Sequence, residues 1–130
     1  MDEPLFLRVE DVKKLHAVSL QRFGGNEGLR DRNAFESAVH HPKNIFYYDQ
    51  GDLFDMAAAY CVHIAQAQAF LDGNKRTGAA AAIVFLEANG YPITGDSMRI
   101  YEGLIEVAKS ETDRAGMAAL LRELTALSDF

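Results

Sequence analysis

Residues 52–70 restrict the fold of this chain more than any other stretch. If they form a helix, apolar side chains cover most of its faces: Leu53, Phe54, Met56, Ala57, Tyr60, Cys61, Ile64 and Ala65. A helix that is apolar on most faces has to be enclosed by other elements. We therefore predict that residues 52–70 form the longest helix and the centre of a helical bundle.

Five further segments carry the three- and four-residue apolar spacing of amphipathic helices. They are residues 8–23, 31–41, 74–88, 98–108 and 114–127. Asp31 is a plausible N-cap for the second segment, which we expect to end before Pro42. Residues 43–51 combine β-forming side chains with a turn signal, which predicts a small β-hairpin or an extended flap. The expected architecture is a compact all-α bundle of six helices.

Composition limits the organisation and the partners of the chain. At 130 residues, 48% of them hydrophobic, we expect a single domain over 1–130. The net charge of −6 argues against direct nucleic-acid binding and favours a protein partner with a basic face. No signal peptide is evident, and the longest apolar run, residues 78–86, is too short to span a membrane. A lone cysteine, Cys61, fits the cytoplasm and is expected in the core.

One short run, residues 70–78, concentrates chemistry between two apolar segments. A helix that starts near Asn74 would direct its free N–H groups and its positive dipole end at the preceding loop, which suits a phosphate group. Lys75 and Arg76 add positive charge there, although they oppose the helix dipole unless an anion binds. Asp72 offers a carboxylate of the kind that Mg²⁺ prefers. The structural alternatives are that Asp72 is only an N-cap and Asn74 only a turn residue.

The run resembles the signature of the Fic/Doc family, His-x-Phe-x-Asp/Glu-Gly-Asn-Gly/Lys-Arg. Lys75-Arg76 matches the Doc-type (death-on-curing) members, where Fic members usually have Gly-Arg. Three other stretches also look Doc-like: 24–31, 52–54 and 85–90. The resemblance implies the Fic/Doc helical bundle, with ATP and Mg²⁺ as cofactors. It also implies transfer of the terminal phosphate to a hydroxyl of a translation protein such as elongation factor Tu.

The resemblance assigns roles residue by residue. Asp72 would hold Mg²⁺, Gly73 and Asn74 would cradle phosphate, and Lys75 and Arg76 would stabilise charge in the transition state. Four residues of the flap would align the target by strand-like pairing: Ile45, Phe46, Tyr47 and Tyr48. The two tyrosines fit a partner interface equally well. Phe70 is expected to be a core anchor that fixes the loop.

Gln68 stands where the family has its catalytic histidine. A glutamine side chain accepts hydrogen bonds but does not take a proton, so loss of a general base would cost about 10²–10⁴ in rate. His63 would lie roughly 140° around the helix from Gln68 and cannot replace it. The other histidines, His16, His40 and His41, are expected at the surface. Gln68 is either an introduced inactivating substitution or the natural residue of a pseudo-enzyme that binds nucleotide or partner.

Two further alternatives remain at this point: AMP transfer of the Fic kind, and a purely structural helical domain. The resemblance also implies control by a small antitoxin whose tail folds on binding. Self-inhibiting Fic proteins carry Ser/Thr-x-x-x-Glu-Gly/Asn. The nearest segment here, from Ser97 to Glu102, is one residue too long. We therefore expect the inhibitor to be a separate chain.

Overall fold

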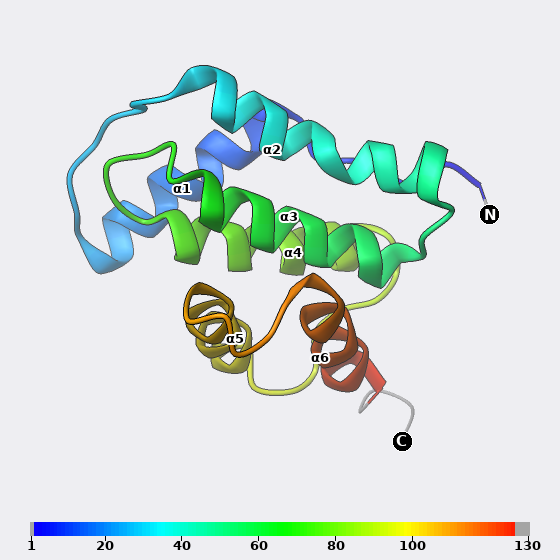
Figure 1. Ribbon diagram of the computed structural model, residues 1–130. Helices are drawn as coiled ribbons and strands as arrows, with labels where there is room; N and C mark the ends of the chain where they lie inside the picture. Colours follow the sequence, from blue (N-terminus) through cyan, green and yellow to red (C-terminus); the bar gives the residue numbers. More distant parts are fainter. Residues whose placement is uncertain (1, 127–130) are drawn as a thin grey trace.

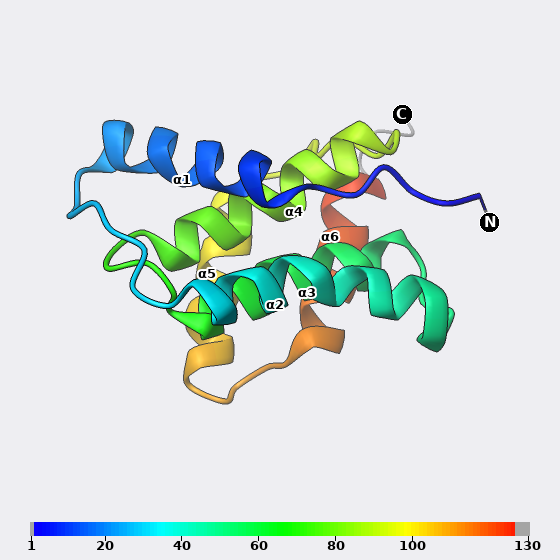
Figure 2. The same ribbon diagram turned by 90° about the horizontal axis from the view of Figure 1, so that it is seen from above.

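The computed structural model describes residues 2–126, which form a bundle of α-helices in three tiers (Figure 1). The elements are α1 (Val9–Phe23), α2 (Arg32–Asn44), the π-helix η1 (Ile45–Asp49), α3 (Leu53–Ala67), α4 (Asn74–Ala88), α5 (Met98–Ala108) and α6 (Arg114–Ala126). Helices α3 and α4 form the middle tier, with α5 and α6 on one side of it. Seen from above, α1 runs beside α4 and α2 runs beside α3 (Figure 2). The predicted all-α class is confirmed.

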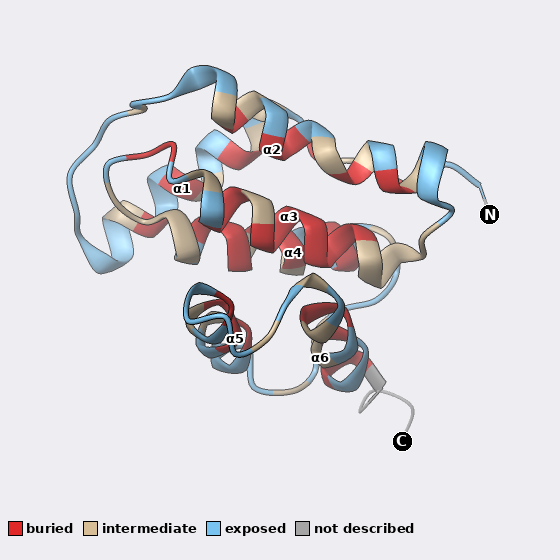
Figure 3. Cartoon of the chain, viewed as in Figure 1, coloured by how far each residue is buried: buried red, intermediate tan, exposed pale blue. Residues whose placement is uncertain are grey.

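Helix α3 is the centre of the bundle, as its apolar composition predicts. Its residues from Met56 to Val62 are all buried, and Figure 3 shows most buried residues gathered on α3 and α4. The two helices approach closely at Gly78, where a Cβ atom would lie 2.6 Å from the carbonyl oxygen of Cys61. Cys61 is a buried free thiol, as expected, and burial raises its pKa to about 12.

The start of α3 is fixed by reciprocal caps and by α6. The carboxylate of Asp52 accepts from the Asp55 N–H at 2.9 Å, and the carboxylate of Asp55 accepts from the Asp52 N–H at 2.9 Å. Arg122 on α6 donates to the second oxygen of Asp52 at 2.7 Å. This contact joins α6 to α3 in the middle tier.

The β-hairpin or extended flap predicted for 43–51 is wrong. Helix α2 continues through Pro42 to Asn44 and passes directly into the π-helix η1. Packing overrides the β-propensity of this segment: Ile45 is 2% exposed, and the ring of Phe46 meets that of Phe6 edge-on at 6.1 Å. The turn predicted at the end of this segment is present. Gln50 is left-handed (φ 54), and the Gly51 N–H donates to the Ile45 carbonyl.

Several helix ends differ from the predicted ones. Helix α3 ends at Ala67 because Gln68 adopts a left-handed conformation (φ 47, ψ 39). It is 15 residues long, the same length as α1 and α4, so it is not the longest helix. Helix α6 is described to Ala126, and the predicted end at Leu127 lies outside the described residues. None of the helices in residues 2–126 is long and apolar enough to cross a membrane.

Candidate active site at the start of α4

The loop between α3 and α4 is shaped by its own asparagine. The Asn74 side chain accepts from the Phe70 N–H at 3.1 Å and donates to the Phe70 carbonyl at 2.9 Å, which closes the loop on itself. Gly73 caps α4 in a left-handed conformation (φ 83, ψ 14) that favours glycine. The first backbone bond of α4 runs from the Thr77 N–H to the Gly73 carbonyl. The N–H groups of residues 74–76 are therefore the donors at the start of the helix.

An aromatic stack supports the loop from below. Phe70 is 4% exposed, which confirms it as a core residue, and it meets the ring of Phe35 at 4.9 Å. The imidazole of His16 lies flat on Phe70, with ring centroids 3.7 Å apart and planes 10° apart. His16 Nε2 also donates to the Asp72 carbonyl at 2.8 Å.

The prediction that His16 lies at the surface is wrong, because this side chain is 6% exposed. The sequence did contain a signal for it. His16 falls on the same helical stripe as Val12 and Leu20, and that stripe packs toward the core. His40 is exposed as expected, whereas His41 is half-buried against α3.

Asp72 binds the loop between α1 and α2 with one carboxylate oxygen, and its other oxygen has no described hydrogen bond. Its Oδ2 accepts from the Asn26 N–H at 2.7 Å, and the cap of α4 is Gly73 rather than Asp72. Within residues 2–126, no group of three or more His, Cys, Asp or Glu side chains could hold a metal ion. The available Oδ1 nevertheless fits Mg²⁺, which commonly takes one or two carboxylates and fills its shell with phosphate oxygens and water.

The predicted catalytic and phosphate-binding residues meet around one cavity of about 310 Å³. Its lining includes Gln68, Asp72, Gly73, Asn74, Lys75 and Arg76, together with Ala65, Leu71 and Tyr101. The four residues predicted as a target flap do not line it, and Tyr47 and Tyr48 are 53% and 80% exposed. The structure thus gathers the motif residues and leaves the flap residues elsewhere.

Positive charge and aromatic rings meet at the rim of this cavity. The guanidinium of Arg76 lies 4.6 Å from the ring centroid of Phe23 and 5.4 Å from that of Tyr101. These contacts hold Arg76 beside the start of α4. Arg30 donates to the Gln68 carbonyl at 2.8 Å and brings a third cation to the loop. Phe23 and Tyr101 escape sequence reasoning because they reach the site from α1 and α5.

Gln68 is an exposed residue beyond the end of α3, in the left-handed conformation that ends the helix. A helical rotation therefore does not relate it to His63. His63 lines a different cavity, to which none of residues 68–78 contributes. Asp72 is the one carboxylate among the residues that line the motif cavity.

Comparison with known proteins gives the family. The model of the Fic/DOC family matches residues 6–86, which cover more than half of the chain and include the whole motif loop. This chain belongs to the Fic/Doc family.

Two curated relatives extend the Fic/Doc likeness beyond α4. "Protein kinase doc" of Escherichia phage P1 is 31% identical over 116 residues, covering 88% of this chain and 91% of the relative. "Toxin Doc" of Mycolicibacterium smegmatis (strain ATCC 700084 / mc(2)155) is 35% identical over 122 residues, covering 89% and 90%. Both alignments span most of the Fic/Doc chain, so the likeness is not confined to the motif.

Proposed function

We propose that this Fic/Doc protein is the toxin of a toxin–antitoxin module and transfers phosphate from ATP to a hydroxyl of a translation protein. The observation that carries the proposal is the single cavity where Asp72, Lys75 and Arg76 surround the start of α4. The two relatives, a protein kinase and a toxin by name, support the same function. Elongation factor Tu is the target we expect, in the cytoplasm.

Each motif residue has a defined task in this proposal. Phosphate oxygens would bind the N–H groups at the start of α4, and Lys75 and Arg76 would stabilise the charge that develops during transfer. Asp72 would hold Mg²⁺, which neutralises phosphate charge when bound. Asn74 serves mainly through its backbone, because its side chain is occupied by Phe70.

Position 68 would carry the base that takes the proton from the target hydroxyl. Glutamine cannot do so, and the cavity lining offers no other base than Asp72, which we assign to the metal. We therefore propose that the chain with Gln68 is strongly impaired. The same observation favours one second candidate, a pseudo-enzyme that binds nucleotide or partner without transfer.

A transfer assay separates these functions. The Gln68→His protein and the unchanged chain are each incubated with elongation factor Tu, Mg²⁺ and ATP labelled at either the α- or the γ-phosphate. We expect γ-label on the factor with Gln68→His only. Transfer of α-label would show AMP transfer, and robust γ-transfer by the unchanged chain would refute the role of position 68. If neither protein transfers label but both bind ATP in calorimetry, the pseudo-enzyme is correct.

We further propose that a small antitoxin controls this site, through a tail that folds on binding. The net charge of −6 favours a tail that carries Lys or Arg. Size-exclusion chromatography and calorimetry with the product of the neighbouring gene test this. A Gln68→His protein that stays inactive in cells without any partner would show that the inhibitor lies within the chain itself.

A further inference from the structure

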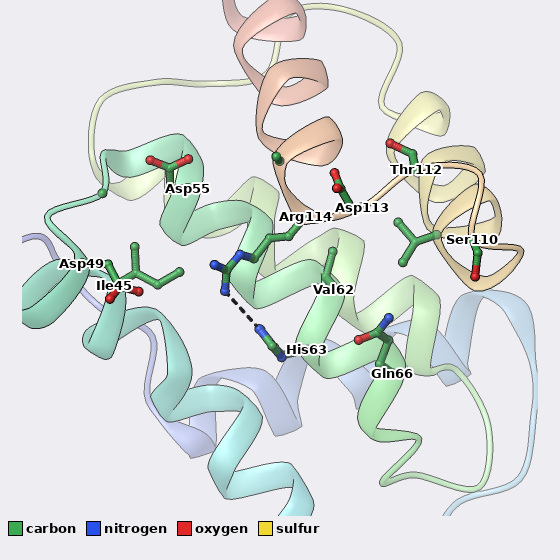
Figure 4. A pocket seen from close by; sticks show the side chains of 13 residues that line it. Ile45, Asp49, Asp55, Val62, His63, Gln66, Ser110, Thr112, Asp113 and Arg114 are labelled. Carbon is green, nitrogen blue, oxygen red and sulfur yellow. Dashed lines mark hydrogen bonds between the residues drawn. The ribbon is translucent and has the colours of Figure 1, made fainter.

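A second cavity, of about 830 Å³, lies away from the motif loop, between η1, α3 and the start of α6 (Figure 4). Its walls are partly apolar, with Ile45, Val62 and Val107, and partly polar, with Gln66, Ser110 and Thr112. The proposed reaction uses none of these residues. The charged residue in the middle of the view is Arg114, the first residue of α6, whose side chain reaches toward His63.

Arg114 contacts two neighbouring imidazoles, whose planes are tilted by 36°. Its Nη1 lies 3.2 Å from Nε2 of His41 and 3.4 Å from Nε2 of His63, and the two rings have centroids 3.8 Å apart. A guanidinium can only donate, so both Nε2 atoms accept and both rings are neutral, with their protons on Nδ1. Burial lowers the pKa of both histidines, and the charge of Arg114 lowers it further. His41 adds to the effect on His63, whose pKa falls to about 4.

Within residues 2–126, no carboxylate neutralises this arginine at close range. Four other arginines form ion pairs within 4.0 Å: Arg8, Arg32, Arg99 and Arg122. Among the described residues, no acidic oxygen lies within that distance of the half-buried Arg114. Withdrawing a guanidinium from water without a counter-charge is unfavourable, and Arg114 also stands at the positive end of α6. An anion in the cavity would relieve both costs.

The acidic residues on the cavity wall limit how much negative charge it can accept. Asp55 is engaged by Arg122 and by the Asp52 N–H, and Asp113 accepts from the Gly116 N–H at 2.9 Å. The Asp49 side chain has no described hydrogen bond, and its charge acts on His41. Three carboxylates around the cavity disfavour a dianion such as phosphate and favour a group with a single negative charge.

We propose that Arg114 is the anion-binding residue of a second ligand site, which takes a monocarboxylate with a small apolar body. The carboxylate pairs side-on with the guanidinium of Arg114. A charged acceptor thereby takes the place of the two neutral imidazole acceptors. The apolar body lies against Ile45, Val62 and Val107. This site is independent of the motif cavity and of the proposed transfer reaction.

Residue-specific NMR of the His41 and His63 imidazoles tests the proposal, because His63 lines this cavity and both rings contact Arg114. The probes are butyrate and inorganic phosphate, at constant ionic strength and neutral pH. We expect saturable shifts of both histidines with butyrate, and binding about tenfold or more weaker in Arg114→Gln. Arg32→Gln, which removes an exposed arginine of α2, is the matched control and keeps the affinity of the unchanged chain.

The test has a second readout in the pH titration of His63. Bound carboxylate cancels the charge of Arg114, so butyrate raises the apparent pKa of His63 in the unchanged chain and in Arg32→Gln. If Arg114→Gln does not fold, Arg114→Lys keeps the charge but loses the planar fork, and we expect weaker binding with a normal melting curve. Unsaturable shifts, shifts that survive in Arg114→Gln, or tighter binding of phosphate than of butyrate would each overturn the assignment.

Discussion

The ring of His16 lies flat against the ring of Phe70, with a centroid distance of 3.7 Å and an angle of 10° between the planes. The two residues are 54 positions apart in the chain. The same imidazole donates to the Asp72 carbonyl, so one side chain of α1 supports both the apolar and the polar part of the motif loop. The position of the candidate site therefore depends on a residue outside the motif.

We expect His16→Ala to lower the free energy of unfolding by about 2–4 kcal/mol, because it opens a cavity under Phe70 and leaves the Asp72 carbonyl without its donor. Chemical denaturation measures the loss. His40→Ala, at an exposed position of α2, is the control and should change stability by no more than about 0.5 kcal/mol. Equal effects of the two substitutions would contradict a supporting role for His16.

Asn74→Asp tests the closure of the motif loop. The aspartate keeps the acceptor for the Phe70 N–H but replaces the donor to the Phe70 carbonyl with a second oxygen. We expect a loss on the order of 1–3 kcal/mol from the unpaired carbonyl and from repulsion between the two oxygens. A thermal melt as high as that of the unchanged chain would show that the loop does not depend on this side chain.

Asp72→Ala and Lys75→Ala, each made in the Gln68→His protein, should abolish transfer and leave the fold intact. Both side chains line the motif cavity and neither belongs to the buried core. Label transfer to the target measures the first effect, and circular dichroism melting measures the second. Loss of folded protein in either variant would mean that the residue is structural, which for Asp72 would point to its bond with Asn26.

Gly78→Ala should force α3 and α4 apart. The added Cβ would meet the backbone carbonyl of Cys61 at 2.6 Å, and a backbone atom in the core cannot move aside. We expect destabilisation of about 1–3 kcal/mol in spite of the better helix propensity of alanine. Val84→Ala, on the solvent side of the same helix, is the control. A Gly78→Ala variant as stable as the unchanged chain would contradict this close approach.

Acid should destabilise the protein through His63 and His41. Their native pKa values are lowered, that of His63 to about 4, whereas an unfolded histidine titrates near about 6.5. The unfolded chain therefore binds more protons between these two values, so stability is complete above the unfolded pKa and falls as the pH drops toward about 4. Solvent screening limits the loss to an order of 1–3 kcal/mol.

Thermal melts across this pH range measure the effect. His63→Asn should flatten the curve between the unfolded and the native pKa, because it removes the group with the larger shift. His40→Asn should leave the curve unchanged, since His40 is exposed on the outer side of α2. Equal slopes for these two variants would show that the pair of His63 with Arg114 does not govern acid stability.

Apolar patterning was enough to predict the bundle and its central helix, because burial of apolar side chains governs both. The motif residues came together as expected because they are close neighbours in the chain. The flap prediction failed because the burial of Ile45 and the contact of Phe46 with Phe6 outweigh local β-propensity. No local pattern distinguishes residues 45–49 as a π-helix.

The remaining differences come from contacts between distant segments. His16 reaches the motif loop from α1, Tyr101 reaches Arg76 from α5, and Arg114 joins His41 to His63 across three helices. A single sequence contains no record of such pairings. Only the position of His16 on an apolar stripe indicated that one of these side chains would be buried.

The loop between α1 and α2 holds the motif loop at several points. The Asn26 N–H donates to the Asp72 carboxylate, and the Gly28 carbonyl accepts from the Leu71 N–H. The Arg30 N–H donates to the Ala69 carbonyl, and the Arg30 guanidinium donates to the Gln68 carbonyl. During synthesis the α1–α2 loop leaves the ribosome well before the motif loop that it shapes. A single cut between α1 and α2 should therefore leave α3 and α4 intact but disorder the motif loop. Proteolysis at this surface loop would then inactivate the site.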